Sequence, residues 1–225
     1  MAERKRLTGR NGKVYQATKG EIITGNGETV LTKGKFYIPL TIAATGSGFP
    51  ENTQAGIVLV GDGTSAPTET ETYIELTLTS QCDIRSGSVE FSNDEIDITT
   101  LCDDLMTYAP GFTDATGSLE GITTLNLSEP MIAKFVTVQK QDATGAITVI
   151  EKNDDPLVLV LNINKTDNSE ADYAAFFAPI TLNGYNLGVQ IKEAQTFTSN
   201  FRIALDNELK PCLIEADKAL FTAGA

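Results

Sequence analysis

The chain has 225 residues and a formal net charge of −13 at pH 7, and it contains 3 cysteines, no tryptophan and no histidine. A chain of this length can bury a hydrophobic core without disulfides or a metal ion. The lack of histidine removes the commonest general base and the commonest metal ligand. Because Cys82, Cys102 and Cys212 show no CxxC spacing, we interpret them as buried, reduced thiols.

The first residues, MAERKRLTGRNGK, contain no apolar core of a signal peptide. The longest apolar run, at 157–161, has the length of a buried strand and is far too short to span a bilayer. We therefore expect a soluble protein that is made in a cytoplasm and has no membrane partner.

The charge is distributed unevenly along the chain. Residues 1–35 carry eight basic and three acidic groups, a net +5, so the remainder carries −13 − 5 = −18. Residues 1–13 are basic, polar and glycine-bearing, and they are predicted to form a flexible N-terminal arm. An acidic body repels nucleic acid rather than binding it.

Alternating apolar and polar residues predict a mainly β chain, with residues 14–225 as a single β-rich domain. We expect a β-sandwich or partly closed barrel with one or two short α-helices. Asn26-Gly27 is predicted to close a hairpin between the first two strands, and polar composition predicts long loops at 45–56 and 61–71. The predicted strands are 14–24, 30–43, 57–60, 73–79, 89–98, 119–127, 147–151, 157–164, 172–182, 187–191, 194–205 and 211–215.

Two short helices are predicted. The first is capped by Thr99 or Thr100, has one apolar stripe and ends at Pro110-Gly111, before a strand that starts at Ser118; the stripe is Leu101, Leu105 and Tyr108. The second starts at Ser128-Glu129-Pro130.

The segment from Glu90 to Gly121 resembles the signature of the major tail tube proteins of long-tailed bacteriophages. That signature combines an acidic Glu-x-Ile-Asp-Ile/Val-Thr strand end, a short Asp-bearing helix with a Tyr, Pro-Gly, and a Gly-Ser strand. Here the strand end reads Asp-Glu-Ile-Asp-Ile-Thr at 94–99. A weaker likeness covers 172–204, with an aromatic-rich strand, an Asn183-Gly184 turn and a Phe197-Thr198 strand.

This resemblance implies a structural subunit that self-assembles into stacked, usually hexameric rings and forms the tail tube, the conduit for DNA ejection. The implied partners are other copies of the chain, the tape measure, terminator and distal tail proteins, and double-stranded DNA that passes without specific binding. The implied location is the virion tail, after assembly in the bacterial cytoplasm. In such an assembly Arg4, Lys5, Arg6 and Arg10 are the candidates for inter-subunit contact.

Two alternatives remain open. A tail terminator, neck or contractile-type tube protein shares the fold, and a monomeric β-sandwich binding or decoration module accounts for the strands and loops. The sequence predicts no catalytic, cofactor-binding or metal site. The acidic pairs, Asp94/Glu95, Asp103/Asp104 and Asp154/Asp155, fit turns or helix starts, and the acidic runs lack EF-hand spacing. Gly61-Asp62-Gly63 lacks the Lys-Ser/Thr of a phosphate loop. We therefore expect a protein that is not an enzyme.

Overall fold

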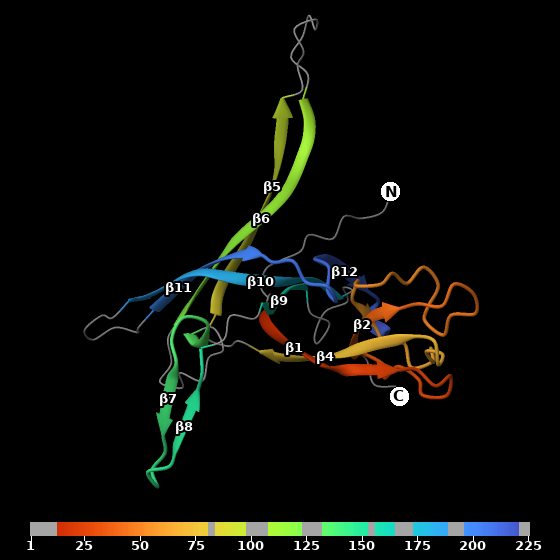
Figure 1. The fold of residues 1–225 in the computed structure, drawn as a ribbon, viewed down its shortest axis with the longest axis horizontal. Coiled ribbons are helices and arrows are strands. Elements are labelled where there is room, and N and C mark those ends of the chain that lie inside the picture. The colour runs from red at the N-terminus through yellow and green to blue at the C-terminus, as the bar shows by residue number, and fades with distance from the viewer. Residues whose placement is uncertain are drawn as a thin grey trace, which may run out of the picture. The chain divides into compact units, whose positions relative to one another are not determined.

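A computed structural model describes residues 13–80, 84–97, 108–122, 132–152, 156–164, 173–188 and 196–220. The chain divides into two compact units (Figure 1). The first comprises 1–82, 156–180 and 204–225, and the second comprises 83–155 and 181–203.

The first unit is an antiparallel sheet with the order β3-β2-β4-β1-β9-β10, and β12 pairs with the other edge of β10. Its last element is the 3-10 turn η3 (Lys218–Leu220). Its strands are β1 (Lys13–Thr24), β2 (Phe36–Thr41), β3 (Leu59–Val60), β4 (Thr72–Ser80), β9 (Leu157–Asn164), the first half of β10 (Tyr173–Gly188) and β12 (Cys212–Ala216).

The core of the first unit forms where the apolar run of β9 meets aromatic residues of β2 and β10. Residues 157–160 are all buried, as the lack of polar alternation predicted. The ring of Phe36 lies 5.3 Å from that of Phe177 and 5.5 Å from that of Tyr173. Contacts of this kind stabilise a sheet through buried area and ring packing.

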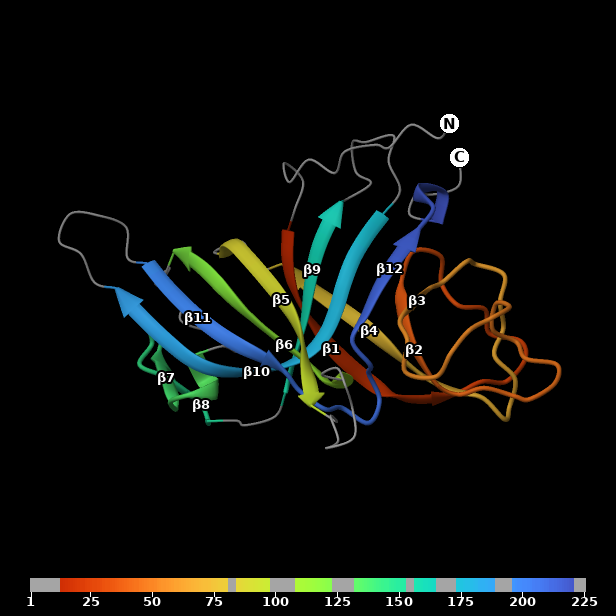
Figure 2. The same ribbon diagram turned by 90° about the horizontal axis from the view of Figure 1, so that it is seen from above.

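The second unit contains a sheet with the order β10-β11-β6-β5, to which β10 contributes its second half. Figure 2 shows its strands side by side. Its strands are β5 (Ile84–Asp97), β6 (Tyr108–Ile122) and β11 (Thr196–Ile203), and a separate hairpin pairs β7 (Val138–Gln141) with β8 (Ile147–Ile150).

The mainly β class is confirmed, and the sheets are not closed into a barrel. The predicted hairpin at Asn26-Gly27 is wrong, because β4 lies between β1 and β2 in the sheet. The predicted turn at Asn183-Gly184 is also wrong, since both residues lie inside β10. There the turn signal of the dipeptide is overridden by pairing with β11.

Neither predicted α-helix is found within the described residues. Leu101, Cys102 and Leu105 lie outside the described residues, but Tyr108 already belongs to β6, so the strand begins ten residues before Ser118. Pro110 pairs with Glu95 beside a one-residue irregularity in the register, a position at which a strand tolerates proline. The predicted second helix is reduced, within its described part, to the 3-10 turn η2 (Ile132–Lys134) and is followed by β7.

Candidate functional site

One face of the second-unit sheet is polar over three strands. The strand registers place Thr116 between Glu90 and Arg202, and Ser118 between Ser88 and Asn200. The same registers place Glu120 between Ser86 and Thr198, and the hydroxyls of Ser88 and Ser118 lie 3.0 Å apart. We call these nine residues the polar face. Its charges are two carboxylates and one guanidinium, and it has no lysine.

The opposite face is packed along β6 and β11. Phe197, Ser199 and Phe201 alternate with the polar-face residues along β11 and are all buried. The ring of Tyr185 stacks on that of Phe197 at 5.4 Å. Ser199 is buried but satisfied, because its hydroxyl donates a 2.9 Å hydrogen bond to the carbonyl of Gly184.

Gly117 is required for this packing. A Cβ at residue 117 would lie 2.2 Å from the carbonyl oxygen of Ser88 and 2.3 Å from the ring of Phe201. The absence of a side chain therefore lets Phe201 lie directly against the β5–β6 pair. One face of the sheet is thus fixed by packing, and the other is left as a short-chained polar surface.

The sheet of the second unit has two open edges in its described part. β5 runs from Ile84 to Asp97 and pairs only with β6 (Figure 1). Residues 181–188 of β10 extend beyond the pairing with β9, which ends at Ile180. Open edges carry unsatisfied N–H and C=O groups that can pair with another chain.

Both predicted loops, 45–56 and 61–71, are loops in the structure, and one buried side chain holds them together. The carboxylate of Glu71 is 0% exposed and accepts hydrogen bonds from the Ser47 hydroxyl at 2.6 Å and the backbone N–H of Gly48 at 2.9 Å. The N–H groups of Ala43 and Thr68 complete its shell. The loops are therefore ordered segments of defined geometry.

These contacts set the charge of the carboxylate. Burial alone would raise the pKa of Glu71, but the hydrogen bonds from Ser47, Thr68, Ala43 and Gly48 outweigh it and lower the pKa to about 2. Asp62 in the second loop behaves alike: burial is outweighed by hydrogen bonds from Ser65 and Thr64, and its pKa falls to about 2. Both loops thus keep their anchoring charges at neutral pH.

The four predicted contact residues, Arg4, Lys5, Arg6 and Arg10, lie outside the described residues. Of the cysteines, Cys212 is a free, buried thiol, and burial raises its pKa. Cys82 and Cys102 lie outside the described part. Across the described ranges, no group of three or more Cys, Asp and Glu side chains is placed to hold a metal ion. Nor does that part of the chain contain a helix both long and apolar enough to cross a membrane.

The polar face was not identified from the sequence, although part of its signal is readable there. The run Thr-Phe-Thr-Ser-Asn-Phe-Arg in β11 alternates apolar with polar residues, apart from the buried Ser199. In β5 the run Arg-Ser-Gly-Ser has no apolar side chain, so the sequence does not indicate which face of the strand is buried. Strand pairing supplies the missing information, because it aligns β5 and β6 with β11.

No protein-family model matches the chain, and no curated protein sequence matches it. Among solved structures, the chain is similar to one from the virion of a native gene transfer agent particle, at 10% sequence identity and a TM-score of 0.39. The match covers 62% of this chain and 88% of the other. A TM-score of this size does not establish a shared fold.

Proposed function

We propose that this protein is a structural subunit that self-assembles into stacked rings and forms a phage-type tail tube, the conduit for DNA ejection. The observation that carries the proposal is the pair of open edges on the second-unit sheet, of which β5 is 14 residues long. The resemblance of residues 90–121 to tail tube proteins points to the same role.

The two open edges belong to different strands, β5 and β10, and pairing between unlike edges favours a ring. If β5 of one copy pairs with residues 181–188 of the next, the contact is head-to-tail and generates a closed ring or a helical filament. The sheet would then run continuously from subunit to subunit and leave neither edge exposed. A long unprotected edge of this kind is a liability in a monomer, because it invites aggregation.

In this assembly the polar face lines the channel. DNA must pass without being held, and each Lys or Arg that neutralises a phosphate adds a counterion-release contribution to binding. A face of Ser, Thr, Asn and Glu with a single arginine, Arg202, offers short polar side chains and a slightly negative charge. The packed face, with Phe197 and Phe201, then belongs to the tube wall.

The ordered loops fit stacking between rings. A loop that is held by a buried carboxylate presents a fixed surface, and a fixed surface loses little entropy when it binds. No chemistry is assigned to the protein in this role, and we propose that it is not an enzyme and acts without a cofactor. Its location would be the virion tail, with the tape measure, terminator and distal tail proteins as neighbours.

The monomeric binding module is less well supported. Such modules commonly present exposed aromatic residues on a sheet face. Among the aromatic side chains whose exposure is described, only Phe91 is strongly exposed, at 59%. The other rings, including those of Phe197 and Phe201, are buried or half-buried.

Hydrogen exchange tests the edge pairing directly. In the monomer, the outward-facing amides of β5 should exchange quickly, and in assembled material they should become protected. The amides of β9 serve as the internal control, because that strand is already paired on both sides. Assembly that leaves the exchange of β5 and of residues 181–188 unchanged would contradict the proposed ring contact.

A further inference from the structure

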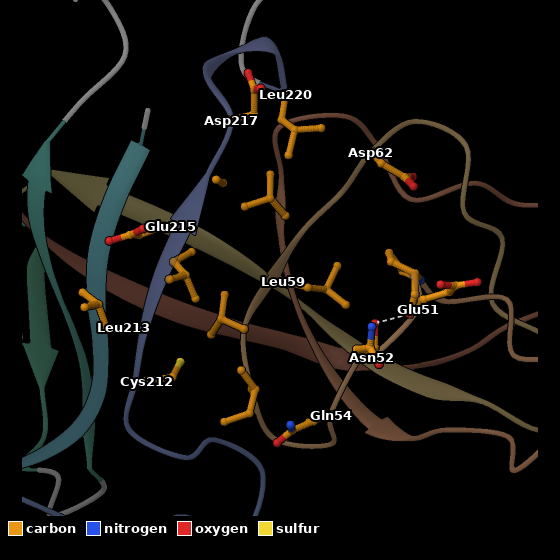
Figure 3. Close-up of a pocket in the computed structure, with 17 residues that line it drawn as sticks. Glu51, Asn52, Gln54, Leu59, Asp62, Cys212, Leu213, Glu215, Asp217 and Leu220 are labelled. Atoms are coloured by element: carbon orange, nitrogen blue, oxygen red, sulfur yellow. Dashed lines mark hydrogen bonds between the residues drawn. The ribbon is translucent and has the colours of Figure 1, made fainter. Parts of the chain in front are cut away.

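The sheet of the first unit leaves a groove between its two end strands. Within the described part of the chain, β3 pairs only with β2 and β12 pairs only with β10. A groove of about 760 Å³ lies between residues 50–62 and β12 with the following turn (Figure 3). Its two sides are joined at one end, where the N–H of Lys210 donates a 2.8 Å hydrogen bond to the carbonyl of Gly56.

The groove has an apolar floor and an acidic rim. Val58, Cys212 and Ile214 are buried in its floor. Every charged residue that lines it is acidic; these are Glu51, Asp62, Glu215 and Asp217. Figure 3 shows Asp217 beside Leu220 at one end, Glu51 and Asp62 across from β12, and Glu215 on the outer side of β12. The groove therefore suits an extended, basic segment with an apolar residue.

The chain itself contains such a segment. Residues 1–12 carry four basic side chains and one acidic, a net +3, with Leu7 among them and no proline. An extended segment without proline can hydrogen-bond to an open strand edge along its whole length. We propose that this groove binds residues 1–12 of a second copy of the chain, with Arg4, Arg6 and Arg10, which share one face of an extended strand, against the acidic rim.

This inference rests on the proposed function, because a second copy must supply the segment. The length is sufficient: 12 extended residues span roughly 40 Å, whereas the five residues of β12 span roughly 17 Å. In the sheet, β9 and β10 lie between β1 and β12. To reach β12, residues 1–12 of the same copy would have to reverse direction before β1 and cross the ends of these two strands.

The binding is tested with a fluorescent peptide of residues 1–12 and a protein that lacks residues 2–10. We expect saturable binding that weakens at least tenfold in the groove variant Glu51→Gln/Asp217→Asn, which removes two charges from the groove itself. The matched control, Glu28→Gln/Glu69→Gln, removes the same charge from exposed positions outside the groove and should bind the peptide normally. Equal loss in both variants, or equal binding of a scrambled peptide, would overturn the proposal, because general charge attraction would then explain the result.

A mixing experiment identifies the source of the segment. At concentrations too low for the strand-edge contact to form rings, full-length groove variant and arm-deleted protein should each stay monomeric, and together they should form a 1:1 complex in analytical ultracentrifugation. Wild-type protein should associate over the same concentration range. Wild-type protein that stays monomeric while the mixture associates would show that each chain fills its own groove, which overturns the proposal. If arm-deleted protein forms tubes, the groove proposal is refuted and the tail tube function stands. If the peptide binds but the protein never forms tubes, only the tail tube function is refuted.

Discussion

The hydroxyl of Ser47 donates a 2.6 Å hydrogen bond to a carboxylate oxygen of Glu71, and this bond ties two long loops to the start of β4. Removal of the carboxylate leaves the backbone N–H groups of Ala43, Gly48 and Thr68 without their acceptor in a buried site.

We therefore expect Glu71→Ala to lower the free energy of unfolding by about 3 kcal/mol or more, measured by urea denaturation. Glu69→Gln is the control, since Glu69 is exposed and lies two residues away, and it should change stability by less than about 0.5 kcal/mol. Equal effects of the two variants would show that Glu71 does not hold the loops.

Acid should weaken the same contact. The pKa of Glu71 in the folded protein is about 2, below its ordinary value of 4.5. The stabilisation is therefore fully present above pH 4.5 and is lost as the pH falls towards 2. The difference in unfolding free energy between wild type and Glu71→Gln should be largest near neutral pH and shrink by about 3 kcal/mol across that interval. A difference that is constant from pH 6 to pH 2.5 would contradict this assignment.

A second stability prediction concerns Gly117. A methyl group at this position would collide with the Ser88 carbonyl and the Phe201 ring, so Gly117→Ala should cost about 1–3 kcal/mol in thermal or urea unfolding. Gly184→Ala is the matched control within β10, because a Cβ at residue 184 would meet no neighbouring atom within 4 Å. If both variants are equally stable, Phe201 does not pack against the β5–β6 pair.

The sequence predicted much of the sheet but not how its strands pair. The bounds of β9 and the burial of residues 157–160 followed from one uninterrupted apolar run. The hairpin at Asn26-Gly27 failed because a turn dipeptide indicates a reversal of the chain, whereas β4 inserts between the strands through contacts far apart in sequence. Pro110-Gly111 failed for a related reason: an irregular strand position tolerates both residues as well as a helix end does.

The candidate sites depend on the same long-range pairing. The polar face needs the register of three strands, and the acidic groove needs β3 and β12 to be the two ends of one sheet. No local pattern encodes either relationship. The basic character of Arg4, Lys5, Arg6 and Arg10 was readable, but the acidic surface complementary to it was not.

The electrostatic role of the polar face can be tested by adding one positive charge per subunit. Thr198→Lys places a lysine on the polar face, and Thr148→Lys places one on an exposed position of β8. Assembled Thr198→Lys tubes should retain short duplex DNA in co-sedimentation, with retention that falls steeply as salt rises. Thr148→Lys tubes should retain less DNA, and equal retention would mean that the polar face does not line the channel.

Self-assembly into a tube is tested by electron microscopy of the purified protein at high concentration. We expect rings that stack into tubes many rings long, with an open central channel. A tail terminator would give single rings that do not stack, and a binding module would give small separate particles. Small separate particles at every concentration tested, from protein with an intact β5, would refute self-assembly.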